Sequence, residues 1–398
     1  MTQTNRFNEP IGPRIATQTR IGLEVEKLRL DAASRLSPKA FPRHLSAPVR
    51  AYVEREYFEA QIEFALPPQA DPEANVAFAD AVIAAVANQL APAERLWPYS
   101  CPPPLSVPPS DALISRQPAA TYPYRQALSQ RYDLRSLMNT GVHVNLSFAP
   151  ALAQLLVAAG DYADTDALYL QVAQQFMVHQ WLLTALFGAT PQSFAGYRQS
   201  PALAHPVRSI RSSSLGFPTS IHGDYRSVAH YVQRIEAALA QGELVRASQY
   251  YESVRLKSSA GKAPRHLLTA GVSHIELRAF DLNPLTTSGV TPAQLRLIQL
   301  LAAYFATQPA LSPAAFDAQM AETRQLNETV ALEDVRAPSV SQARGLALLA
   351  QVAAFAEAQQ VPTVMRQSVH QAQRALQAST ASLAYQVWTQ QRKLPLPF

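Results

Sequence analysis

The chain has 398 residues, of which 48% are hydrophobic and only 16% are charged, and its formal net charge is +5. A chain of this length and hydrophobicity can bury a large core, which excludes intrinsic disorder. The single cysteine, Cys101, excludes an internal disulfide framework and a zinc site built on cysteines, and we expect it to be a small buried residue.

The partners suggested by charge are small anions rather than macromolecules or membranes. No run of lysine and arginine indicates a nucleic-acid partner, and only the pI of about 9.3 would favour one. No apolar run is long enough to predict a membrane helix. The first residues, MTQTNRFNEP, lack the charged and then apolar layout of a signal peptide, so we expect a cytoplasmic protein.

The elements predicted in chain order are five strands and several helical segments. The strands are expected at 21–30, 58–66, 141–148, 250–257 and 272–280. Helices are expected from Asp71-Pro72 onward, at 150–188 with a break near Gly160, at 226–241, and from Thr291-Pro292 through the C-terminal region. The segments 97–109 and 193–222 are predicted to be loops. Because strands and helices do not alternate strictly, we expect an α+β fold with an antiparallel sheet.

Alternation along the predicted strands collects polar residues on one face. These are Glu24 and Glu26; Glu59, Gln61 and Glu63; His143, Asn145 and Ser147; Tyr251, Ser253, Arg255 and Lys257; and His274, Glu276 and Arg278. A solvated sheet face is the common interpretation of such a pattern. Acids at i and i+2 repel unless a cation lies between them, however, and carboxylates with a histidine are the ligands expected of Mg²⁺ or Mn²⁺.

The basic residues of the same face, Arg255, Lys257 and Arg278, supply the charges that phosphate needs. The sequence contains neither a GxxxxGK[ST] nor a GxGxxG motif, which excludes a Walker or Rossmann phosphate loop. The pattern therefore indicates a phosphoryl-transfer site on a sheet face, without a P-loop.

Several motifs in order resemble one family. They are GLEVEKLR at 22–29, EYFEAQIEFALPP at 56–68, RLWPYSCPPPL at 95–105, YRQALSQRY at 124–132, NTGVHVNLSF at 139–148, LFGATP at 186–191, SIRSSSLGF at 209–217, YYESVRLK at 250–257 and HIELRAFDLNPLTTSGV at 274–290. The chain resembles bacterial glutamate–cysteine ligase (γ-glutamylcysteine synthetase), which also forms the front half of bifunctional glutathione synthases.

The resemblance implies a glutamine-synthetase-like fold, in which a curved antiparallel sheet is covered outside by helices. It implies one catalytic domain over 1–398, with the motifs at about 20–290 and a helical region at about 291–398. The implied reaction joins the γ-carboxylate of L-glutamate to the amine of L-cysteine through a γ-glutamyl phosphate, with ATP as substrate. No ATP-grasp module follows, so we do not expect this chain to make glutathione itself.

The resemblance also assigns expected roles to individual residues. Glu24, Glu26, Glu56, Glu63, His143 and Glu276 are the expected Mg²⁺ (or Mn²⁺) ligands. Arg278 is the expected partner of the transferred phosphoryl group, and Arg211 is expected to bind glutamate or phosphate. Arg131, Tyr132, Asn145, Tyr251, Arg255 and Lys257 are expected to contact substrates, and Trp97 and Tyr99 to wall an amino-acid pocket.

Several of these residues also fit ordinary structural roles. Glu56 could instead be a solvated acid, and His143 could be a histidine of the core. Arg131 and Arg255 could form ordinary salt bridges, and the aromatic residues could pack in the core. Asp281 and Asn283 are expected to shape the turn after the last strand. A γ-glutamyl ligase with a different amine acceptor, and a non-catalytic regulator that binds nucleotide or metal, are the alternatives for the whole chain. The sequence does not indicate the oligomeric state.

Overall fold

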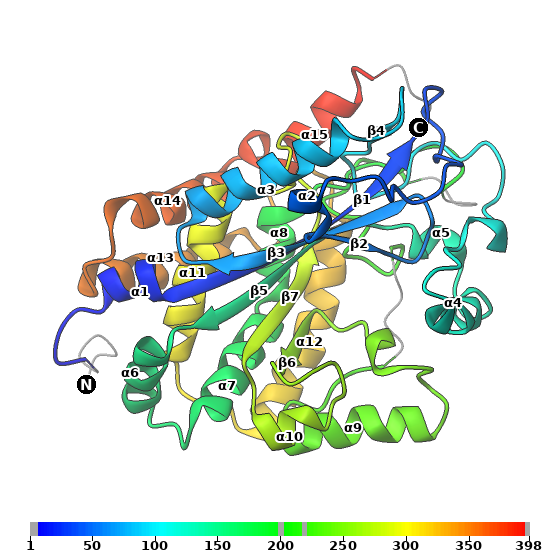
Figure 1. The fold of residues 1–398 in the computed structure, drawn as a ribbon. Coiled ribbons are helices and arrows are strands. Elements are labelled where there is room, and N and C mark those ends of the chain that lie inside the picture. Colours follow the sequence, from blue (N-terminus) through cyan, green and yellow to red (C-terminus); the bar gives the residue numbers. More distant parts are fainter. Residues whose placement is uncertain (1–6, 198–202, 217–220, 395–398) are drawn as a thin grey trace.

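The computed structural model describes residues 7–197, 203–216 and 221–394, and an antiparallel sheet lies at its centre (Figure 1). The strands run in the order β2–β3–β1–β5–β7–β6, and β4 pairs with the end of β1. Their bounds are β1 Thr19–Leu30, β2 Val53–Arg55, β3 Gln61–Gln69, β4 Arg95–Leu96, β5 Val142–Phe148, β6 Val254–Lys257 and β7 His274–Phe280. The predicted antiparallel α+β architecture is confirmed.

Helices account for about half of the remaining described residues. They are α1 Gly12–Gln18, α2 Ala47–Arg50, α3 Pro72–Ala87, α4 Tyr122–Ser129, α5 Leu134–Leu137, α6 Pro150–Gly160, α7 Thr165–Val178, α8 Gln180–Phe187, α9 Val228–Ala240, α10 His266–Ala270, α11 Pro292–Ala306, α12 Pro313–Leu332, α13 Gln342–Ala358, α14 Thr363–Gln377 and α15 Leu383–Gln391. None of the helices in these described stretches is long and apolar enough to cross a membrane.

One face of the sheet is apolar and forms the main core. Leu23 pairs with Val144 in register, Val25 pairs with Phe64, and all four side chains are fully buried. Helices α3, α7, α8 and α11 pack against the strands on this side (Figure 1). The other face is thereby left to the polar residues, as the alternation predicts.

Local signals for two helix starts are confirmed. The Asp71 carboxylate accepts hydrogen bonds from the backbone N–H groups of Glu73 and Ala74 at the start of α3. Thr291 and Gln294 form a capping box at the start of α11. Both devices satisfy N–H groups that the first turn of a helix leaves without a partner.

Two predicted strands begin three or four residues later in the structure than the sequence predicts. The strand predicted from residue 58 starts at Gln61, because Phe58 forms only an isolated bridge with Ile114 and residues 59–60 form a turn. Glu59 pairs with Arg55 at 2.7 Å and accepts from the N–H of Phe41. The strand predicted from residue 250 starts at Val254, so Tyr251 precedes it. The helical region 150–188 has a second break at His179, between α7 and α8. Phe217 of the SIRSSSLGF motif lies outside the described residues.

Candidate active site

The polar face of the sheet carries acids, one histidine and basic residues in rows that cross the strands. In register these rows are Glu54–Glu63–Glu26, Glu24–His143 and Asn145–Glu276–Arg255. Because opposite residues in adjacent strands lie about 5 Å apart, each row brings together charges that are distant in sequence. The face predicted from alternation therefore exists as one surface.

A cavity of about 950 Å³ lies over this face. All six residues expected to bind metal line it, as do five of the expected substrate-side residues: Glu24, Glu26, Glu56, Glu63, His143 and Glu276, with Arg211, Tyr251, Arg255, Lys257 and Arg278. Further walls come from β2, α4, α5 and α9, from the segment before β6 and from the loop between β6 and α10. A volume of this size is in the range of small-molecule sites.

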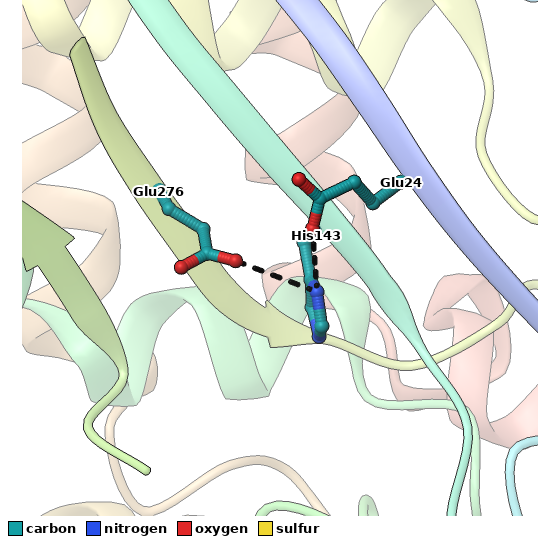
Figure 2. A group of neighbouring side chains, drawn as sticks. All are labelled: Glu24, His143 and Glu276. Atoms are coloured by element: carbon teal, nitrogen blue, oxygen red, sulfur yellow. Dashed lines mark hydrogen bonds and ion pairs between the residues drawn. The ribbon is translucent and has the colours of Figure 1, made fainter. Parts of the chain in front are cut away.

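Glu24, His143 and Glu276 form a compact group on three adjacent strands (Figure 2). One ligand atom of each lies within 4.8 Å of those of the other two. The Nδ1 atom of His143 is 3.2 Å from Glu24 Oε2 and 3.7 Å from Glu276 Oε1. Asn145 donates to the other oxygen of Glu24 at 3.0 Å, which helps to orient that carboxylate.

The protonation states of this group suit metal binding. Burial and the nearby Arg278 lower the pKa of His143 to about 4, so its imidazole is neutral at pH 7. Burial opposes ionisation of Glu24, but its hydrogen bond with His143 leaves its pKa below the ordinary value. Neutral imidazole and ionised carboxylate are the forms that bind metal ions.

Glu276 is surrounded by basic side chains. Burial opposes its ionisation, but Arg278, Arg255 and Lys257 hold its pKa well below the usual range. Their nitrogens lie 2.9, 3.6 and 3.2 Å from its oxygens, respectively. Glu276 therefore orients three basic side chains at the edge of the carboxylate–histidine group, which consists of Glu24, His143 and Glu276. An anionic ligand bound there would contact the basic side chains and lie beside this group.

A second set of carboxyl groups lies beside the first, on β1, on β3 and in the turn before β3. Burial, together with the neighbouring Glu56, raises the pKa of Glu26 to about 8 and the pKa of Glu63 well above its ordinary value. Burial likewise raises the pKa of Glu56. Acids this close hold protons unless a cation offsets their repulsion. The donor set thus fits one or more hard divalent ions.

Arg211 reaches the same region from the loop that follows α8. Both terminal nitrogens of its guanidinium donate to the backbone carbonyl of Arg278, each at 3.2 Å. The group packs over Gly141, where a Cβ atom would lie 2.3 Å from its Nη2 atom. Glycine at this position leaves the room that the guanidinium occupies.

Asn145 contacts Glu24 without lining the cavity, and four other predicted residues lie elsewhere. Arg131 is exposed and donates to the carbonyls of Gly242 and Glu243. Tyr132 accepts from Gln249 and lies edge-on to Tyr251, without lining the cavity. The other two, Trp97 and Tyr99, are buried against Phe194, with ring centroids about 5 Å apart, so they pack in a core rather than wall the cavity. Buried Cys101 fits its expected packing role.

Arg125 is a cavity residue that the sequence prediction did not select. Its side chain is buried, donates to the carbonyls of Ser115 and Gln117, and its charge opposes the rise in the pKa of Glu56. Helical spacing was an available signal, because Arg125 and Leu128 share the buried face of α4. Further lining residues are Glu54, Tyr124, Glu252, Lys262 and His274.

Comparison with known proteins identifies the family. A family model described as glutamate–cysteine ligase matches residues 6–243 and 241–330. The chain therefore belongs to the glutamate–cysteine ligase family, which confirms the resemblance seen in the motifs.

Curated relatives are bifunctional proteins of glutathione biosynthesis. The chain is 31% identical over 324 residues to that of Streptococcus agalactiae, covering 79% of this chain and 42% of that protein. It is 31% identical over 354 residues to that of Lactiplantibacillus plantarum, covering 87% of this chain and 46% of that protein. The chain thus spans about half the length of the curated relatives it matches.

Two solved structures share the fold. A bifunctional glutathione synthetase from Pasteurella multocida superposes with a TM-score of 0.82 at 23% identity, over 98% of this chain and 50% of that chain. A glutamate–cysteine ligase from Francisella tularensis, solved in complex with AMP, superposes with a TM-score of 0.83 at 18% identity, over 95% of this chain and 85% of that chain. At these identities the likeness supports the fold.

Proposed function

We propose that this chain is an ATP- and Mg²⁺-dependent ligase that forms γ-glutamylcysteine, ADP and phosphate from L-glutamate and L-cysteine. The observation that carries the proposal is the placement of Glu24, His143 and Glu276 beside Arg278 and Arg211 in one cavity. Family membership supports the reaction class, and the curated relatives are named for glutathione biosynthesis.

The first chemical step brings two anions together. An oxygen of the glutamate γ-carboxylate attacks the γ-phosphorus of ATP, the new O–P bond forms, and the bond from that phosphorus to ADP breaks. A divalent ion held by the carboxylate–histidine group would neutralise the phosphate charge and act as a Lewis acid. In this proposal Arg278, which contacts Glu276 at 2.9 Å, pairs with the transferred phosphoryl group.

The second step transfers the acyl group. The amine nitrogen of cysteine attacks the acyl carbon, a C–N bond forms, and the C–O bond to phosphate breaks. The amine gives up a proton, and phosphate leaves with the electron pair. Arg211 and Arg278 both line the cavity, and in the proposed reaction their positive charges would lower the cost of the negative charge that develops on the leaving phosphate.

The test is phosphate release by purified protein with ATP, Mg²⁺ and glutamate when an amine is added. The proposal expects release with cysteine and a higher kcat/KM for cysteine than for other amino acids. A higher kcat/KM for another amine would make the chain a γ-glutamyl ligase with a different acceptor. One methylene in an acceptor pocket is worth only about 1–3 kcal/mol, so a panel is needed. No release with any amine would contradict the ligase assignment and favour a non-catalytic regulator.

A further inference from the structure

Asp281 follows the end of β7 and its side chain does not shape the turn there, unlike the expectation from sequence. Asn283 does so, because its Oδ1 atom accepts from the N–H of Leu285. The Asp281 carboxylate is instead buried and turns toward the loop residues after α8. A buried carboxylate requires strong compensation from donors or cations.

Three donors converge on one oxygen of Asp281. Its Oδ2 atom accepts from the backbone N–H of Ala189 at 2.7 Å and from the hydroxyls of Thr190 and Ser209, each at 2.8 Å. The hydroxyl of Thr190 also accepts from the backbone N–H of Arg211 at 3.1 Å. This network fixes the position of the carboxylate and ties it to the backbone of Arg211.

The second oxygen of Asp281 is left for the side chain of Arg211. Its Oδ1 atom is buried, accepts no hydrogen bond from the described residues, and lies 3.8 Å from Arg211 Nη1. The same guanidinium donates to the carbonyl of Arg278 and packs over Gly141. Asp281 itself does not line the cavity, whereas Arg211 does.

We propose that Asp281 is a positioning residue, whose carboxylate holds the guanidinium of Arg211 against the backbone of Arg278 so that it meets an anionic oxygen of the substrates in one orientation. The expected effect of Asp281 on turnover rests on the proposed function. Its structural content is that Asp281 acts through Arg211. The geometry supports this direction of action because Asp281 does not line the cavity, whereas Arg211, whose Nη1 atom lies 3.8 Å from Asp281 Oδ1, does.

The test is a double-mutant cycle with Asp281→Asn and Arg211→Ala. Asparagine has the same shape and keeps an acceptor for the Thr190 and Ser209 hydroxyls, but it lacks the charge that attracts the guanidinium. We expect kcat/KM to fall about 10- to 100-fold in Asp281→Asn, and the double variant to be no less active than Arg211→Ala alone. If the two losses multiply, Asp281 does not act through Arg211 and the inference is overturned.

A second readout separates this inference from the proposed function. A crystal structure of Asp281→Asn should show the Arg211 guanidinium displaced from the carbonyl of Arg278, whether or not the wild type makes γ-glutamylcysteine. An unchanged guanidinium would overturn the inference. If Asp281→Asn does not fold, Ser209→Ala removes one of the three donors, and its smaller loss of kcat/KM should likewise vanish in the Arg211→Ala background; a loss that persists there would contradict the inference.

Discussion

Glu24 and His143 face each other across β1 and β5, with Glu24 Oε2 3.2 Å from His143 Nδ1 although 119 residues separate them in the chain. Glu276 on β7 completes the group. Three motifs that are separate in sequence therefore meet at one point, where ionised carboxylates and a neutral imidazole offer oxygen and nitrogen ligands to a divalent ion.

Replacing Glu24 by Gln should remove one of these ligands while keeping its shape. Mutating a residue that only orients a metal ligand lowers metal affinity or activity roughly 10- to 100-fold. Loss of a ligand itself should therefore lower activity at saturating Mg²⁺ by more than about 100-fold. The matched control is Glu73→Gln, in a surface pair with Arg296 on α3 and α11, which should keep nearly full activity. Equal activity of both variants in the phosphate-release assay would argue against the metal site.

Mg²⁺ should stabilise the protein more at pH 8 than at pH 6. Without metal, burial and Glu56 raise the pKa of Glu26 to about 8, against an ordinary 4.5. Between these values the folded state holds a proton that the unfolded state has lost, so stability falls with rising pH by about 1.4 kcal/mol per pH unit for this carboxyl. Mg²⁺ replaces the proton and should reverse that loss.

The measurement is the melting temperature at each pH with Mg²⁺ and with a chelator. Glu26→Gln stays neutral at all pH values, so its metal-free stability should depend less on pH than that of the wild type. A Mg²⁺-induced rise in melting temperature that is equal at both pH values, or larger at pH 6, would contradict this role of Glu26.

Substitutions of Arg125 and Arg131 should differ sharply in their effects on kcat/KM. Arg125→Met keeps much of the bulk but removes a buried charge next to Glu56, and we expect kcat/KM to fall by at least about 10-fold. Arg131→Ala removes only exposed contacts with the carbonyls of Gly242 and Glu243, so its kcat/KM should stay within about threefold of wild type. The reverse order would restore the sequence-based role of Arg131.

Gly141→Ala should disturb Arg211 without changing any charge. The added Cβ would lie 2.3 Å from Nη2 of Arg211, which is too close for any stable contact, so the guanidinium must move. We expect kcat/KM to fall about 10- to 100-fold with a smaller change in melting temperature, because the clashing atoms belong to the end of a flexible side chain rather than to the backbone. Wild-type activity would show that the position of this guanidinium does not matter for turnover.

Alternation along strands predicted much of the sheet and its polar face. Alternate residues of a strand point to opposite faces of the sheet, whichever strand lies next to it. Glu24 and Glu26 could therefore be assigned to the polar face from β1 alone. The strand order and the register could not, because they depend on contacts between distant segments. The offset of residues in β5 against β7, for example, follows an irregularity between Val142 and Val144 that no local pattern marks.

The residues whose positions were wrongly predicted from the sequence lie just outside regular strands and helices. Glu59 lies in a turn just before β3, and Arg131 follows the end of α4, so neither obeys the alternation or helical spacing of the neighbouring element. Asp281 also lies just past a strand, and its partners come from loops about 70 to 90 residues earlier. Such contacts are fixed by tertiary packing and leave no signal in a single sequence.

The γ-glutamyl phosphate route can be tested by following an oxygen atom from glutamate to phosphate. L-Glutamate labelled with ¹⁸O in its γ-carboxylate is incubated with the protein, ATP, Mg²⁺ and L-cysteine, and the phosphate is analysed by mass spectrometry. An acyl phosphate passes one carboxylate oxygen to the phosphate that leaves, so we expect one ¹⁸O atom in each phosphate formed with γ-glutamylcysteine. Product formed with unlabelled phosphate would contradict the γ-glutamyl phosphate route.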